Sequence, residues 1–240
     1  MKTRILLLLV PLMFLIGGCK KKSPLNAATA KLKTVTLNSP TINETYTLSY
    51  TSDNKLLLYQ GSGGDKITYS YAGNTVTVNQ YDTTGALSET DVYYLNSAGL
   101  ADSEVLSYSG TVNYESFTYD ANGYKIKMLF YDATNTLTEI YNWTITNGNA
   151  TYYYYTDNLL NVMGTQTTTY LADKLSSTGN QNSGLSLFGN SSTNLAATAV
   201  VTGYTNASYT YTYTFDNNGL ETSMTSTGTG GTYVWSYTYY

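Results

Sequence analysis

The side chains in this chain that could carry out acid–base or nucleophilic chemistry are few and of restricted kinds. The 240 residues include no histidine and a single cysteine, Cys19. Serine–histidine, cysteine–histidine and histidine–metal sites are therefore excluded. Carboxylates remain, and a pair of carboxylates is sufficient for glycoside hydrolysis. The carboxylates that qualify are Asp82, Glu89, Asp91, Asp102, Glu104, Glu115 and Asp120.

Most of these carboxylates lie in turn sequences or alternate with threonine, a pattern that favours solvated hairpin residues. Asp53, Asp157 and Asp216 adjoin asparagine in turns and carry oxygen ligands of the type that Ca²⁺ prefers. No stretch has the full spacing of an EF-hand loop. We therefore expect no catalytic residues, no metal and no cofactor, and interpret the protein as non-enzymatic.

Tyrosine is the other residue type that could bind a ligand, and the chain has 27 of them. A tyrosine ring presents a flat apolar face and a hydroxyl group, which suits stacking on sugars or adhesive contacts. The alternative is that alternating tyrosines pack one face of a sheet, and their period of two favours it. In the run from Tyr152 to Tyr155 successive rings must point to opposite sides of a strand. The candidate ligand-binding residues are Tyr152, Tyr153, Tyr154, Tyr155, Trp143 and Trp235.

The chain begins with a segment typical of a secretory signal, residues 1–18. Lys2 and Arg4 form a basic region, and the stretch 5–16 is almost wholly apolar. The sequence Ile16-Gly17-Gly18-Cys19 resembles the bacterial lipobox, in which the cysteine becomes the acylated first residue of a lipoprotein. An ordinary signal peptide with a chance cysteine is the alternative. The resemblance implies lipidation at Cys19, a tether over residues 19–33 and, because residue 20 is not Asp, sorting to the outer membrane, with the membrane face left open.

The charge balance restricts the partners. Without Lys2 and Arg4, ten basic and 16 acidic side chains remain, a net charge of −6. Nucleic-acid binding is not expected, because it requires clustered lysine and arginine. The only basic run, Lys20 to Lys22, would lie beside the anchor, either on anionic lipid headgroups or as a solvated start of the tether. The expected partners are the membrane, through the anchor, and a glycan or an envelope protein.

From Val35 onward the residue pattern is typical of short strands separated by turns. Short runs rich in Tyr, Thr, Val and Leu are separated by Gly, Asn, Asp and Ser, and no proline falls after Pro40. The period-two alternation of Tyr209 to Phe215 with threonine is the clearest strand, and Asp216 to Gly219 turns the chain after it. We predict an all-β fold over residues 34–240, an antiparallel up-and-down meander of about 14 strands. The meander is expected to be barrel-like, closed or partly open.

One segment, residues 172–195, breaks this rhythm, being rich in Ser, Gly and Asn. Loops of this length in a compact domain are usually functional or disordered. Leu185, Leu187 and Phe188 are expected to plug one end of the barrel, because contiguous apolar side chains seldom stay exposed.

The lipobox, the tyrosine–aspartate hairpins and this late insertion together resemble a class of Gram-negative secreted lipoproteins, a domain of unknown function with a porin-like fold. The matching residues of the insertion are Tyr170, Asp173-Lys174 and the stretch from Ser191 to Leu195. The hairpins also resemble the tyrosine–aspartate repeats of large secreted shell proteins. The resemblance implies a curved antiparallel sheet and brings no catalytic residues.

A barrel that itself crosses the membrane is the competing architecture. The aromatic C-terminal strand from Val234 to Tyr240 is similar to those of outer-membrane barrels. Such barrels need an apolar outer band between aromatic girdles, whereas here tyrosine occurs mid-strand and the opposite face is threonine and serine. We therefore expect a tethered envelope lipoprotein that serves as a binding or structural module. The alternative is a surface glycan-binding protein that uses exposed tyrosine and tryptophan.

Overall fold

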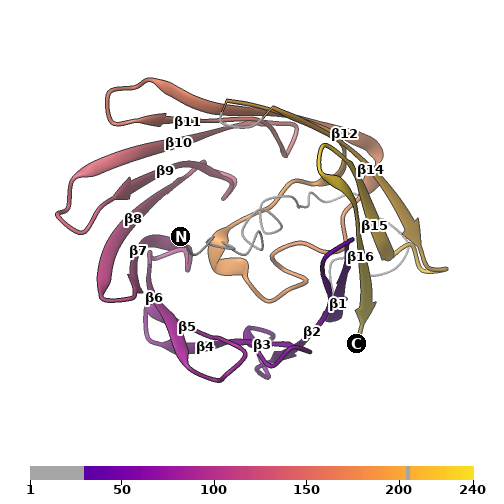
Figure 1. Ribbon diagram of the computed structural model, residues 1–240, viewed down its shortest axis with the longest axis horizontal. Helices are drawn as coiled ribbons and strands as arrows, with labels where there is room; N and C mark the ends of the chain where they lie inside the picture. Colours follow the sequence, from indigo (N-terminus) through magenta and orange to yellow (C-terminus); the bar gives the residue numbers. More distant parts are fainter. Residues whose placement is uncertain (1–29, 204–205) are drawn as a thin grey trace.

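The computed structural model describes residues 30–203 and 206–240, which form one closed antiparallel β-barrel of 16 strands. Each strand pairs with its neighbours in sequence, and β1 pairs with β16 to close the ring (Figure 1). The strands are β1 Leu32–Asn38, β2 Asn43–Tyr50, β3 Leu56–Gly61, β4 Lys66–Ala72, β5 Thr75–Tyr81, β6 Leu87–Leu95, β7 Ala101–Tyr108, β8 Thr111–Tyr119, β9 Lys125–Tyr131, β10 Leu137–Thr146, β11 Asn149–Asp157, β12 Val162–Leu175, β13 Asn194–Gly203, β14 Ala207–Phe215, β15 Glu221–Gly228 and β16 Gly231–Tyr239.

The predicted all-β up-and-down meander is confirmed, and the barrel is closed rather than partly open. The strand number is 16 where the sequence suggested about 14, because the connections between β1 and β2 and between β13 and β14 were not recognised as turns. The ladder begins at Leu32, within the segment that the sequence assigned to the tether. No helix among residues 30–203 and 206–240 is long and apolar enough to cross a membrane.

Side chains alternate between the lumen and the outer surface, as their period of two requires. On β14, Tyr211 and Tyr213 turn inward and pack beside the buried core, whereas Thr210 and Thr212 are exposed. Threonines on neighbouring strands pair across the outer surface through their hydroxyls. Examples are Thr34 with Thr238 at 2.7 Å, Thr165 with Thr202 at 2.7 Å and Thr169 with Thr198 at 2.7 Å.

The tyrosine–aspartate pattern is explained by how its hairpin turns are held together. In the turn after β8, one carboxylate oxygen of Asp120 accepts hydrogen bonds from the backbone N–H groups of Asn122 and Tyr124, both at 2.9 Å. The same two bonds, to the second and fourth residues onward, recur at Asp82, Asn96, Asp132, Asp157 and Asp216. An Asp or Asn side chain that replaces a backbone acceptor is the usual chemistry of such turns.

The irregular segment predicted at 172–195 is shorter in the structure, spanning residues 176–193 between β12 and β13, and we name it the plug. It enters the barrel from one end and carries the short 3₁₀ helix η2 (Ser186–Phe188) (Figure 1). Leu185 and Leu187 are 3% and 5% exposed and belong to the buried core, so their predicted packing role is confirmed. Phe188 packs edge-on against Tyr93 of β6, with ring centroids 5.1 Å apart.

The buried core lies between the plug and the barrel wall. Its side chains come from the inner face of strands β1 to β5, β7 and β8, from the plug and from β15 and β16. They are Leu32, Val35, Leu48, Leu56, Tyr69, Val76, Val78, Ala101, Phe117, Leu185, Leu187, Met224 and Tyr237. A cavity of about 120 Å³ remains beneath the plug, lined by apolar residues such as Leu48, Tyr69 and Leu185. Polar residues of the plug, among them Asn180 and Ser183, complete the lining of this cavity.

Candidate functional site

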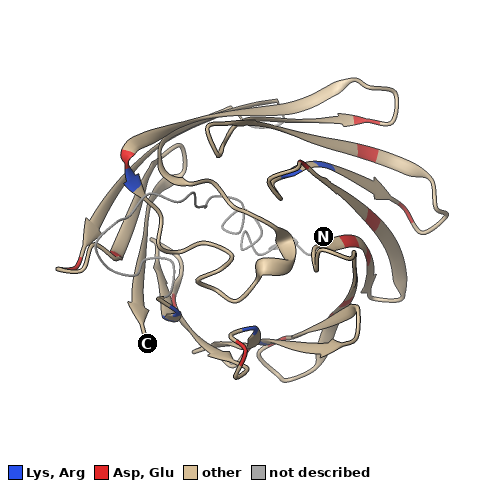
Figure 2. Ribbon diagram, turned by 180° about the vertical axis from the view of Figure 1, so that it is seen from behind, with Lys and Arg blue, Asp and Glu red and all other residues tan. Residues whose placement is uncertain are grey.

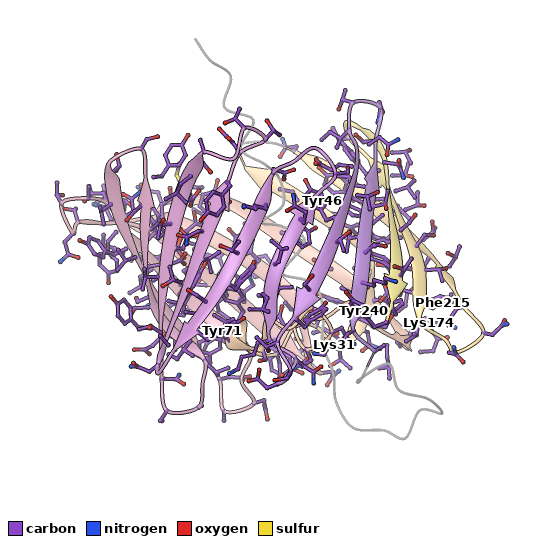
Figure 3. The ribbon with its side chains drawn as sticks, turned by 90° about the horizontal axis from the view of Figure 1, so that it is seen from below. Lys31, Tyr46, Tyr71, Lys174, Phe215 and Tyr240 are labelled. Atoms are coloured by element: carbon purple, nitrogen blue, oxygen red, sulfur yellow. The ribbon has the colours of Figure 1, made fainter. Side chains whose placement is uncertain are left out.

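The plug closes the end of the barrel at which even-numbered strands such as β2, β8 and β10 end. We call this end the plugged rim. Lys31, Lys174, Phe215 and Tyr240 lie near it, and Tyr46 lies near the opposite rim (Figure 3). Backbone bonds attach the plug to this rim on several sides, including Leu56 N–H to Gly184, Asn190 N–H to Gly123 and Thr193 N–H to Gly148.

The strongest anchor of the plug is Glu221, at the start of β15, which is only 1% exposed. Its carboxylate accepts hydrogen bonds from the Ser177 N–H at 2.8 Å and from the hydroxyls of Ser176, Ser177 and Thr178 at 3.1 to 3.3 Å. Tyr239 of β16 donates to the Glu221 carbonyl oxygen at 2.9 Å. Burial raises the pKa of Glu221, and these donors oppose that effect. One carboxylate therefore ties the start of the plug to the barrel wall.

The tyrosine run of β11 divides between the two faces of the barrel wall. Tyr153 and Tyr155 face the lumen, while Tyr152 and Tyr154 form a tilted pair on the outside, with centroids 5.8 Å apart. The prediction that successive rings point in opposite directions is therefore confirmed. Only one half of the run can act together on a ligand inside the barrel.

The lumen-facing tyrosines belong to an aromatic stack that two paired strands build. The register of β10 and β11 sets Tyr141 opposite Tyr155 and Trp143 opposite Tyr153. The Tyr141 and Tyr155 rings are nearly parallel, at 15° with centroids 5.4 Å apart, and Trp143 lies 5.3 Å from Tyr153. Period-two alternation places the four rings on one face of the two strands, and the register brings them together.

This stack lines a cleft of about 420 Å³ at the rim opposite the plugged rim, which we call the mouth cleft. Its lining residues are Thr138, Glu139, Tyr141, Tyr153, Tyr155, Asp157 and Met163. Glu139 and Asp157 are cross-strand partners, so two carboxylates stand side by side at the edge of the tyrosine surface. The cleft thus combines flat aromatic faces with hydrogen-bond acceptors.

The two carboxylates are held in different ways. Glu139 accepts a hydrogen bond from the hydroxyl of Tyr141. Asp157 accepts bonds from the side chain of Asn161 and from two backbone N–H groups, and these bonds, that of the Asn161 side chain first, lower its pKa. Asp157 is therefore ionised at neutral pH, which makes the cleft acidic.

Further inside, the same side of the barrel carries buried carboxyls. Asp91 of β6 and Glu104 of β7 are 4% and 5% exposed, and Glu104 stands opposite Glu115 of β8. Figure 2 shows acidic positions spread over the strands of this side. The expectation that these three carboxylates are solvated was wrong, because the strand register turns them into the lumen. It holds for Asp82 and Asp120, which lie in exposed turns.

Burial dominates the protonation of these carboxyls. It raises the pKa of Asp91 to about 7, with a further contribution from the charge of Glu89. It raises the pKa of Glu104 well above its usual value, and Glu115 adds to that effect. One cation, Lys125 at the start of β9, lies over the rings of Phe117 and Trp143, at 4.9 and 5.4 Å from their centroids. Burial lowers the pKa of Lys125 to about 8, although Glu115 and Glu104 oppose this.

The candidate residues from the sequence are thus divided by the structure. Tyr153, Tyr155 and Trp143 meet in one aromatic stack, whereas Tyr152 and Tyr154 lie outside the barrel. Trp235 of β16 stacks on Tyr233 and packs against the core, away from the mouth cleft. Cys19, the predicted lipidation site, lies outside the described residues.

Two residues of the cleft, Tyr141 and Glu139, were missed as ligand-binding candidates. Their signal is present in the sequence: Glu139, Tyr141 and Trp143 alternate on β10 as Tyr153, Tyr155 and Asp157 do on β11. Within the described ranges, no three or more acidic or cysteine side chains are arranged to hold a metal ion.

Comparison with known proteins gives a fold and nothing more specific. No protein-family model and no curated protein matches the sequence. Among solved structures, a porin-like protein from Bacteroides uniformis has a TM-score of 0.68 at 16% identity, covering 87% of this chain and 98% of its own. A porin-like protein from Bacteroides vulgatus has a TM-score of 0.61 at 11% identity, covering 88% and 99%. This chain is similar to porin-like proteins of Bacteroides in fold.

Proposed function

We propose that this protein is a non-enzymatic binding module of the bacterial cell envelope and that its ligand occupies the mouth cleft. The observation that carries the proposal is the arrangement of Tyr141, Tyr153 and Tyr155 beside Glu139 and Asp157 at the unplugged rim. Ligand sites are typically concave and mostly apolar, with a few convergent polar groups, and this cleft has that composition. The porin-like fold of the solved neighbours supports an envelope location.

A glycan is a second candidate ligand, and one observation favours it. Tyrosine faces can stack on sugar rings, and the two adjacent carboxylates accept hydrogen bonds from hydroxyl groups. An aromatic strip with polar neighbours is thus present in the cleft. Aromatic residues elsewhere, such as Tyr69 and Tyr237, are buried in the core.

Catalysis by carboxylates receives less support. Glu104 and Glu115 form a close buried pair, but they line neither of the two cavities described above. Lys125 also lies close enough to both to compensate part of their charge. A hydrolase would need its two carboxyls to flank a bound substrate.

The proposal places the barrel in water, held to the outer membrane by an acyl chain on Cys19. The threonine pairs of the outer surface support this, because hydroxyl-rich strands do not suit a hydrocarbon environment. Radiolabelled palmitate should label the wild-type protein and not Cys19→Ser, and equal labelling would refute the anchor.

The binding proposal is tested on the tyrosine run itself, which supplies its own control. A library of glycans and small amines is screened against the purified full chain by isothermal calorimetry and by quenching of aromatic fluorescence. Tyr153→Ala and Tyr155→Ala should each weaken binding of any hit, because both rings line the cleft. Tyr152→Ala and Tyr154→Ala, on the outer face of the same strand, should not. Hits that are insensitive to the first two variants would contradict the proposal.

A further inference from the structure

We propose that the mouth cleft binds its ligand through a protonated amine, held between the tyrosine faces and the carboxylates of Glu139 and Asp157. This inference rests on the proposed function and assigns a chemical class to its ligand. The amine can belong to an amino sugar or to a simpler organic amine, since both present the same ammonium group.

The charge of the cleft is the first reason. Its lining contains Glu139 and Asp157, and no Lys or Arg of the described chain is among the lining residues. The turn that holds Asp157 stabilises its ionised form through three donors. An anionic ligand would be repelled there, while a cation gains from both carboxylates.

The aromatic surface is the second reason. The faces of Tyr141 and Tyr155 lie nearly parallel, and Tyr153 continues the same surface at 6.2 Å from Tyr155. A cation over such faces is attracted by the ring quadrupole, and aromatic clusters of this kind recognise ammonium groups. The barrel already uses this contact, since Lys125 lies over Trp143, the next ring of the stack.

The buried carboxyls behind the cleft are the third reason, and Asp91 is the telling one. Although it is only 4% exposed, no hydrogen-bond donor in the described chain reaches its Oδ1 atom, and Gln80 reaches only Oδ2, at 3.3 Å. The charge of Lys125 acts on Glu104 and Glu115 and lowers the pKa of both, against the larger effect of burial. A cation that enters the lumen on this side would favour the ionised forms of these carboxyls, whose pKa values burial raises.

The acidic groups act on one another across this side of the barrel. Burial is the main cause that raises the pKa of Glu115, and the charge of Glu139 adds to it. Burial and then the hydrogen bond to Glu139 raise the pKa of Tyr141, and the charge of Glu115 adds a smaller effect. The carboxyls of the mouth cleft and the buried carboxyls are therefore electrostatically coupled.

The test uses two pairs of probes that differ in a single amine: glucosamine against glucose, and phenethylamine against phenethyl alcohol. Binding to the purified full chain is measured by calorimetry at neutral pH. We expect the amine of at least one pair to bind at least tenfold more tightly than its neutral partner. Its affinity should fall as salt is raised, because the carboxylates at the rim are screened.

The pairs also identify the source of the amine. Preference for glucosamine alone indicates an amino sugar, and preference for phenethylamine alone indicates a simpler amine; both support the inference. Neutral and cationic partners that bind equally would overturn it and leave the proposed function standing, since the tyrosine variants test that separately. Binding by none of the four probes would overturn it as well.

Matched variants locate the effect. Glu139→Gln and Asp157→Asn should each weaken the amine about tenfold and leave the neutral partner unchanged. Asp132→Asn is the control, because Asp132 holds the neighbouring turn with the same two backbone bonds and does not line the cleft. An equal loss of affinity for the amine in the Asp132→Asn control would refute the role of the cleft carboxylates. Circular dichroism verifies that each variant is folded.

Discussion

Replacing Asp91 by Asn should stabilise the barrel, and only at neutral to alkaline pH. Asp91 is buried, and its pKa is raised from 3.8 to about 7 in the folded protein. A carboxyl whose folded pKa lies above its unfolded value contributes stability below about pH 4, and this contribution is lost as the pH rises through about 7. Asn has nearly the same shape, can keep a hydrogen bond to Gln80 and carries no charge to bury.

The size of the effect follows from the two pKa values. Their difference corresponds to ~4 kcal/mol of free energy, and interaction with Glu89 makes ~2–4 kcal/mol a reasonable range for one substitution. For a chain of this size, that range corresponds to a rise of about 4–16 °C in melting temperature. The rise should be present at about pH 8 and absent at about pH 4, where the wild-type carboxyl is protonated.

The assay is thermal unfolding followed by circular dichroism at both pH values, with Asp102→Asn as the control. Asp102 is an exposed acid on the adjacent strand β7, so its substitution should change the melting temperature little at either pH. If Asp91→Asn lowered the melting temperature equally at both pH values, the ascribed cost of burying this charge would be refuted.

Two further predictions concern the plug. Glu221→Ala should destabilise the barrel by about 2–4 kcal/mol, because the Ser177 N–H and three hydroxyls lose their acceptor. Limited proteolysis of this variant should then cut within residues 176–193. An unchanged melting temperature and an unchanged cleavage pattern would contradict the anchoring role of Glu221. Gly189→Ala should lower the free energy of unfolding, measured by chemical denaturation, more than Gly85→Ala does. Both glycines have a positive φ, 78° and 82°. A methyl group at residue 189 would meet the Gly123 carbonyl and the Tyr119 ring, whereas the space around residue 85 is open. An equal loss of stability in the two variants would mean that backbone strain alone, and not the steric contact at residue 189, determines the effect.

The barrel was predictable because its signals are local. The alternation of Tyr209 to Phe215 and the turn residues after it report strand and turn without reference to the rest of the chain, and repeated units of this kind imply neighbouring strands. The strand number was less accessible, since the connections between β1 and β2 and between β13 and β14 lack the Asn-Gly or Asp-x-x-Gly pattern that marks many of the other turns. The same alternation also predicted that the aromatic face of each strand packs on the core.

The candidate site was predictable only in part, because it depends on register between strands. Tyr153 and Tyr155 were expected to share a side, but nothing local brings Asp157 beside Glu139; the β10–β11 pairing does so. Asp91, Glu104 and Glu115 were misread for the same reason. Their threonine and serine neighbours suggest a solvent face, and only the closed wall shows that the carboxyls occupy the enclosed side.

The pairing of β1 with β16 has a consequence for how the barrel forms. Val35 meets Tyr237 in this pair, and the Tyr240 hydroxyl donates to the Leu48 carbonyl, so the seam joins segments far apart in sequence. Loop-closure entropy opposes such distant pairings, and folds that depend on them form slowly. Until the seam closes, both strands are open edges able to pair with other chains. We expect this last step to limit the rate of folding, with aggregation through the open edges as the competing reaction.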